Sequence, residues 1–206
     1  KLNEALAKYE ESLQILLKIF GRDHPDVAKS LLNIGSAYGQ MGKLDLALPK
    51  FEQALTIQVK IFGYNHPLVA ASLNNIGEVY RIMGKFDEAL PKYEEAIRIW
   101  TKHFGYNHPL VAASLNNIGE VYRIMGKFDE ALPKYEEAIR IWTKHFGDNH
   151  PDVATSLGSI GAVYWGSGQK IEAIAKYEEC LRITTKILGP HHPDTIKVKQ
   201  FLESVK

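Results

Sequence analysis

Apolar side chains recur every three or four residues between residues 67 and 84. The members of this stripe are Val69, Leu73, Ile76, Tyr80 and Met83. That spacing places them on one face of a helix, which we call helix A. Pro67 predicts where helix A begins, because proline suits the first helical position, and Gly84 predicts where it ends.

A second stripe with the same spacing predicts a second helix, helix B. Its inward-facing members are expected to be Phe86, Ala89, Leu90, Tyr93, Ala96, Ile97, Trp100 and Phe104. Gly105 then suits a left-handed C-terminal cap. Pro91 falls inside helix B. If Asp87 is the N-cap, Pro91 removes only about one backbone hydrogen bond, so we expect a mild kink and not a break.

This pair of helices repeats with a period of 42 residues. Residues 63–104 recur without a change as residues 105–146, and five His-Pro dipeptides mark the period. Stacked arrays of this kind are usually binding surfaces. We expect one elongated all-α domain over residues 1–206. Its expected parts are a half repeat at 1–20 (helix B), full repeats at 21–62, 63–104, 105–146 and 147–188, and a half repeat at 189–206 (helix A).

The composition of the chain argues against binding to nucleic acid and to membranes. With 25 basic and 24 acidic residues the formal charge is +1, which gives no electrostatic footprint for nucleic acid or an acidic membrane. No run approaches the roughly 20 apolar residues of a membrane span. The start lacks an apolar secretory segment and the chain has one cysteine, which favours a cytoplasmic setting. Cys180 replaces an alanine of the other repeats and is expected to be a small core residue.

Enzyme and metal motifs are missing from the sequence. It contains no Gly-x-x-x-x-Gly-Lys phosphate loop, no His-Glu-x-x-His helix and no Gly-x-Ser-x-Gly elbow. Histidines of successive repeats would lie about 10 Å apart, too far to share one zinc ion without another ligand. We therefore expect no catalysis, no cofactor and no functional metal, and we assign the His-Pro dipeptides to the turn into helix A.

The residues inside one period resemble a known family. Leu73-x-x-Ile76-Gly77-x-x-Tyr80, then Gly84, then Ala89-x-x-x-Tyr93 and Ala96 resemble the tetratricopeptide repeat, and the pattern recurs along the whole chain. The 42-residue period, longer than the usual 34, is similar to the repeats of kinesin light chains. The resemblance implies a right-handed superhelical solenoid of antiparallel helix pairs, whose concave groove, lined by A helices, binds an extended peptide or a partner protein.

The resemblance also indicates candidate ligand-binding residues, on the face of helix A turned away from helix B. They are Asn33, Asn74, Asn75, Glu78, Arg81, Asn116, Asn117, Glu120, Arg123 and Trp165. Asparagine offers both a donor and an acceptor to a peptide backbone, so a row of asparagines can hold an extended chain with little dependence on its sequence. The family's lysine clamp for a terminal carboxylate is not reproduced, because alanine replaces Lys29 in the central repeats.

Structural alternatives stand beside each of these assignments. The asparagines can cap or bridge neighbouring helices, and Glu78 with Arg81 can form a solvated ion pair. Trp165 can anchor a ligand or pack near Phe201 of the next helix. For the whole chain, the alternative to an interaction module is a structural spacer or an array that self-associates end to end, because apolar helix faces are expected at both ends.

Overall fold

The computed structural model of the protein describes residues 2–205, which form ten α-helices and no strand. The A helices are α2 (Pro25–Gln40), α4 (Pro67–Ile82), α6 (Pro109–Ile124), α8 (Pro151–Gly166) and α10 (Pro193–Val205). The B helices are α1 (Leu2–Phe20), α3 (Leu44–Phe62), α5 (Phe86–Phe104), α7 (Phe128–Phe146) and α9 (Lys170–Leu188). The predicted all-α class is confirmed.

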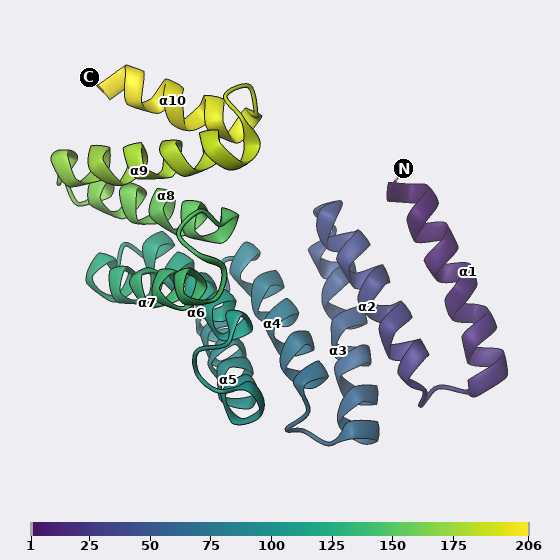
Figure 1. The fold of residues 1–206 in the computed structure, drawn as a ribbon. Helices are drawn as coiled ribbons and strands as arrows, with labels where there is room; N and C mark the ends of the chain where they lie inside the picture. Colours follow the sequence, from purple (N-terminus) through teal and green to yellow (C-terminus); the bar gives the residue numbers. More distant parts are fainter. Residues whose placement is uncertain (1, 206) are drawn as a thin grey trace. The chain divides into compact units, whose positions relative to one another are not determined.

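The helices fall into two compact units, Lys1–His103 and Phe104–Lys206. In the first unit α2 packs against both α1 and α3, and in the second α8 packs against both α7 and α9 (Figure 1). Within each unit, helices that follow one another along the chain thus pack together, which is the packing of a helical-repeat solenoid. Within residues 2–205, none of the helices combines the length and the apolar character that a membrane span requires.

The core of each repeat consists of the predicted stripes. In the third repeat Val111, Leu115 and Ile118 of α6 are buried, as are Ala131 and Tyr135 of α7. In helix A the pattern missed Val79, Val121 and Val163, which are buried, and in helix B it missed Ile99, Ile141 and Ile183. The isoleucines were missed because helix B is covered from more than one side, so its buried surface is wider than one stripe.

A glycine in each of the A helices α2, α4, α6 and α8 allows the aromatic ring of the following helix B to approach closely. A Cβ atom added to Gly119 would lie 3.0 Å from Cε1 of Tyr135, and one added to Gly77 would lie 2.9 Å from Cε1 of Tyr93. The same pairing joins Gly35 with Phe51 and Gly161 with Tyr177. The glycine therefore sets the distance between the two helices of a pair.

The His-Pro dipeptides begin the A helices, as predicted. Nδ1 of His108 accepts a hydrogen bond of 3.2 Å from the backbone N–H of Leu110, and His24, His66, His150 and His192 make the equivalent bond. The imidazole of His108 also stacks on Phe104 at 4.5 Å between ring centroids. The expected core position of Phe104 is wrong: this ring is 49% exposed and packs on the histidine cap.

The histidine cap predicts a pH dependence of stability. Burial, and then the nearby His145, lower the pKa of His108 from its usual 6.5. A lowered pKa means that the unfolded chain binds the proton more readily, so the stabilisation is present above about pH 6.5 and is lost as the pH falls below it. Protonation also removes the Nδ1 acceptor.

The variant His108→Asn keeps a hydrogen-bond acceptor at this position but does not titrate. When the pH falls from 7.5 to 5, we expect the free energy of unfolding to drop by about 1 kcal/mol less in this variant than in the unmutated protein. Urea denaturation at the two pH values measures this. Equal losses in both proteins would contradict the role of the cap.

The turn from helix A to helix B differs from the prediction at one residue. Lys85 N–H donates to the Tyr80 carbonyl at 2.9 Å, and Ala89 N–H donates to the Lys85 carbonyl at 3.0 Å. Lys85 therefore closes α4 and precedes α5 directly. Asp87, which the sequence analysis considered as an N-cap, lies instead in the first turn of α5. Helix α5 continues through Pro91 without a break.

Helix B ends at a glycine with positive φ, as predicted, but its conformation is not the usual left-handed one. Gly147 has φ 85° and ψ 169°, and Gly63 and Gly189 have nearly the same values. A left-handed helical residue has ψ near 47°. The observed region is essentially restricted to glycine, because a Cβ atom clashes there.

Candidate functional site

The predicted ligand-binding residues lie on A helices and are half-buried. Asn33 lies on α2. Asn74, Asn75, Glu78 and Arg81 lie on α4, Asn116, Asn117, Glu120 and Arg123 lie on α6, and Trp165 lies on α8. Their side chains are outside the core in each unit, as the helical spacing predicted.

The asparagines play two different roles. The Asn116 Oδ1 atom accepts a hydrogen bond of 2.7 Å from the hydroxyl of Ser156, which joins α6 to α8. This is the bridging role that was the structural alternative. Asn33, Asn75 and Asn117 stand one position later in their repeats, and their side chains have no hydrogen bond to another residue among residues 2–205. Each therefore keeps its donor and acceptor for an incoming group.

Glutamate, arginine and tyrosine form the same cluster in both identical repeats. In α6, Nε and Nη2 of Arg123 donate to the Glu120 carboxylate at 2.9 and 2.6 Å. The Tyr135 hydroxyl from α7 donates to the same carboxylate at 2.8 Å. Glu78, Arg81 and Tyr93 repeat this arrangement. The pair is thus half-buried and held by a core tyrosine, and is not the freely solvated pair of the structural alternative.

The surroundings of the cluster raise the pKa values of its tyrosine and its arginine. Burial, followed by the nearby Glu120 carboxylate, raises the pKa of Tyr135 above its usual value of 10. The hydrogen bond to Glu120 raises the pKa of Arg123. The tyrosine stays neutral and the arginine stays charged at any physiological pH. The cluster is therefore a fixed, locally neutral feature of this face, without a group poised for proton transfer.

The sequence analysis did not predict the hydrogen bonds from the tyrosine hydroxyl groups to the glutamates. It placed Tyr93 and Tyr135 in the core, where they are, but did not assign a partner to their hydroxyl groups. A partial signal was present: in the first repeat both members change together, to Ser36 and Phe51, although the fourth repeat has Ala162 and keeps Tyr177 at these positions. Because phenylalanine has no hydroxyl, it needs no carboxylate opposite it.

Trp165 packs against the following A helix. Its ring meets Phe201 of α10 edge-on at 5.1 Å between centroids, and Nζ of Lys170 lies 5.7 Å from its centroid. This is the packing that the sequence offered as the alternative to a ligand anchor. The residue is half-buried.

Reactive groups are not gathered at this face. Among residues 2–205, no group of three or more His, Cys, Asp or Glu side chains is placed to hold a metal ion. Cys180 is 4% exposed, and burial raises the pKa of its thiol to about 11. A neutral, buried thiol is a poor nucleophile, and Cys180 packs as the small core residue that was predicted.

The sequence model of the tetratricopeptide repeat family matches this chain in four overlapping segments, residues 1–60, 33–102, 68–144 and 110–186. The family resemblance found from the residues is confirmed. A search among curated proteins found no significant relative.

Solved structures similar to this chain share its fold. The nearly identical TPR-like repeats of a putative kinesin light chain from P. anserina are 27% identical, with a TM-score of 0.71 over 90% of this chain and 88% of that one. BtubC (BKLC) from P. vanneervenii is 20% identical, with a TM-score of 0.82 over 100% of this chain and 83% of that one. The apo form of RapI is 16% identical, with a TM-score of 0.78 over 99% and 76%. The last two show the fold alone.

Proposed function

We propose, on the premise that this chain belongs to the tetratricopeptide repeat family, that it binds an extended peptide of a partner protein through its A helices. Repeats of this family are in general non-catalytic protein-interaction scaffolds, and the array of helix pairs is of that kind. The candidate contacts for the ligand are Asn33, Asn75, Glu78 and Arg81 in the first unit and Asn117, Glu120 and Arg123 in the second.

The observation that carries this proposal is the free hydrogen-bonding capacity of one asparagine in each of the first three full repeats. Asparagine is a poor residue for a helix interior, so its recurrence there needs a reason. Asn116 has such a reason in its bond to Ser156, whereas Asn33, Asn75 and Asn117 have no partner among residues 2–205. An amide at that place can bond to the N–H and C=O of an extended backbone.

The charges beside the asparagines favour a neutral or mixed-charge peptide. Each carboxylate of Glu78 and Glu120 already accepts three hydrogen bonds, from an arginine and a tyrosine. The arginine and glutamate charges are matched within each cluster. A strongly acidic or basic peptide would therefore find no unmatched charge there, and affinity should come mainly from backbone hydrogen bonds.

A selection from a random peptide display library tests this proposal. We expect the unmutated protein to enrich peptides that the triple variant Asn33→Ala, Asn75→Ala, Asn117→Ala does not bind, with affinity for them reduced at least tenfold. Each lost hydrogen bond is worth about 1 kcal/mol, so three account for more than a factor of ten. The melting temperature should hardly change, because these amides make no hydrogen bond to any other residue between 2 and 205.

The matched control removes three asparagines elsewhere. Asn65, Asn107 and Asn149 occupy one equivalent position, where each Oδ1 accepts from an arginine of helix B. Alanine at these three positions should leave peptide affinity unchanged. If both triple variants bind equally well, the asparagine row is not the site. If the folded, unmutated protein enriches no peptide, the alternative of a spacer or self-associating array is favoured, and sedimentation at several concentrations decides between those two.

A further inference from the structure

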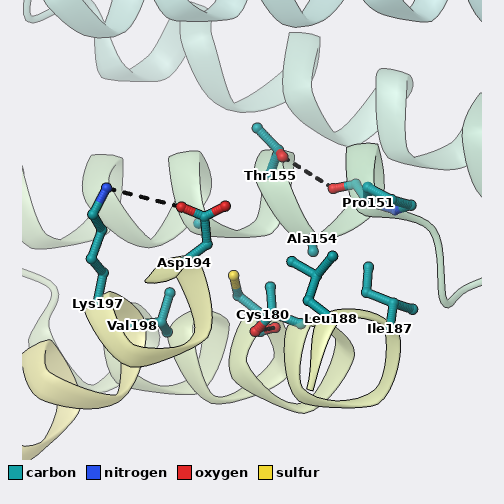
Figure 2. Close-up of a pocket in the computed structure, with 11 residues that line it drawn as sticks. Pro151, Ala154, Thr155, Cys180, Ile187, Leu188, Asp194, Lys197 and Val198 are labelled. Atoms are coloured by element: carbon teal, nitrogen blue, oxygen red, sulfur yellow. Dashed lines mark hydrogen bonds and ion pairs between the residues drawn. The ribbon is translucent and has the colours of Figure 1, made fainter. Parts of the chain in front are cut away.

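The second unit contains a pocket of about 280 Å³ between α8, α9 and α10. Figure 2 shows Cys180, Ile187 and Leu188 extending from α9 toward Ala154 of α8, while Val198 of α10 lies at one side. This volume is close to the lower end of the range of about 300–1,000 Å³ for small-ligand sites.

Polar groups around the pocket are already bonded to their own helices. Thr155 donates to the Pro151 carbonyl at 3.0 Å, and Thr184 donates to the Cys180 carbonyl at 3.0 Å. Nζ of Lys197 lies 3.9 Å from an Asp194 carboxylate oxygen (Figure 2). The pocket therefore presents methyl, methylene and thiol groups to its interior, which suits a neutral, apolar ligand.

The preceding repeat indicates the shape of that ligand. Three residues that line the pocket have a different residue 42 positions earlier. Thr184 corresponds to Trp142, Gly158 to Asn116, and Val198 to Ser156. There the Trp142 indole is 4% exposed, and Asn116 and Ser156 bond to each other. At the positions equivalent to Thr184 and Gly158, the preceding repeat thus carries a buried indole and a carboxamide that is bonded to Ser156.

We propose that the pocket lined by Gly158, Cys180, Thr184 and Val198 binds a planar aromatic ring of indole size. The backbone of the repeat is the one that surrounds Trp142, but the indole and the carboxamide are missing from it. An apolar pocket of this kind gains dispersion contacts when a ring fills it. Two sources can supply the ring: a free small molecule, or a tryptophan side chain of a partner protein.

Calorimetric titration of the protein with free indole, and separately with the tripeptide Gly-Trp-Gly, tests the proposal. We expect one site with Kd on the order of 1 mM, as befits a ligand of few atoms. Binding of indole alone assigns the pocket to a small molecule. Binding of the tripeptide assigns it to a side chain of a partner. Binding of neither, at about ten times that concentration, overturns the proposal.

The thiol of Cys180 locates the bound ring in the unmutated protein. Cys180 is the one cysteine of the chain, and its sulfur lies 3.7 Å from where a Cβ atom of Gly158 would be. Its reaction with methyl methanethiosulfonate, followed by mass spectrometry, should slow roughly tenfold when indole is present at ten times its Kd. An unchanged rate would place the ring elsewhere and overturn the proposal.

Two variants separate this pocket from nonspecific binding. Thr184→Trp restores the residue found at position 142, and should weaken indole binding at least tenfold. The reverse transplant, Asn116→Gly with Trp142→Thr and Ser156→Val, should create a second pocket and raise the stoichiometry from one to two. Circular dichroism establishes that both variants are folded. A folded Thr184→Trp variant that binds indole as before would also overturn the proposal.

Discussion

Gly119→Val is expected to lower the free energy of unfolding by about 3 kcal/mol, because the added atoms overpack the contact between α6 and α7. A Cβ atom at Gly119 would already lie 3.0 Å from the Tyr135 ring. That ring is fully buried and its hydroxyl is held by Glu120, so it has little freedom to move away. The two helices must therefore separate. Urea denaturation followed by circular dichroism measures the loss.

Gly158→Val provides the matched control for this prediction. Gly158 lies three residues before Gly161, the α8 equivalent of Gly119, but its nearest contact for an added Cβ is the Cys180 sulfur at 3.7 Å, an ordinary van der Waals distance. We expect a change of less than about 1 kcal/mol there, since valine is no worse than glycine inside a helix. Similar losses for both variants would mean that backbone flexibility, and not the Tyr135 contact, explains the effect at Gly119.

Gly147→Ala is expected to lower the free energy of unfolding by about 2 kcal/mol, because φ 85° and ψ 169° belong to a region that only glycine adopts without strain. No neighbouring atom lies within 4 Å of a Cβ added there, so the cost arises from the backbone alone. Gly147→Asn should cost about as much, since asparagine relieves strain only in the left-handed helical region. Thermal and urea denaturation of both variants check this.

The variant Gly126→Asn is the control that shows whether the cost at Gly147 comes from its backbone conformation. Gly126 follows α6 with φ 71°, and the bond from Lys127 N–H to the Tyr122 carbonyl identifies a Schellman turn, whose glycine is left-handed. Asparagine is accepted at such positions, so we expect a cost below about 1 kcal/mol. If asparagine costs the same at both glycines, the special conformation at the end of helix B does not limit stability.

Local rules allowed most of the fold to be predicted. Pro67 and Gly84 gave the limits of α4 because proline and glycine act through their own backbone, whatever surrounds them. The two differences from expectation arose where a neighbouring segment decides. Asp87 has the chemistry of an N-cap, but the Schellman turn at Lys85 begins α5 earlier. Phe104 continues the apolar stripe, but at the last position of α5 its ring stacks on the imidazole of His108, four residues further along the chain.

The candidate site was less predictable, because side-chain partners on other helices cannot be identified from one period. The spacing placed Asn116 and Asn117 together on one face, but only the position of Ser156 separates a bridging asparagine from an unbonded one. For the same reason the sequence placed Phe201 near Trp165 without deciding between packing and ligand binding, whereas the structure shows the two rings in contact.

The turn between helix B and the next helix A has a consequence for how such a chain can change in length. Each full repeat begins at a glycine, and the first four boundaries have the same dipeptide, from Phe20-Gly21 to Phe146-Gly147. Removing or adding 42 residues at these boundaries restores the same dipeptide, the same glycine conformation and the same stacked imidazole. Unequal recombination between the two identical segments would therefore yield a shorter or longer chain with every junction intact, so the number of repeats can vary without any compensating substitution.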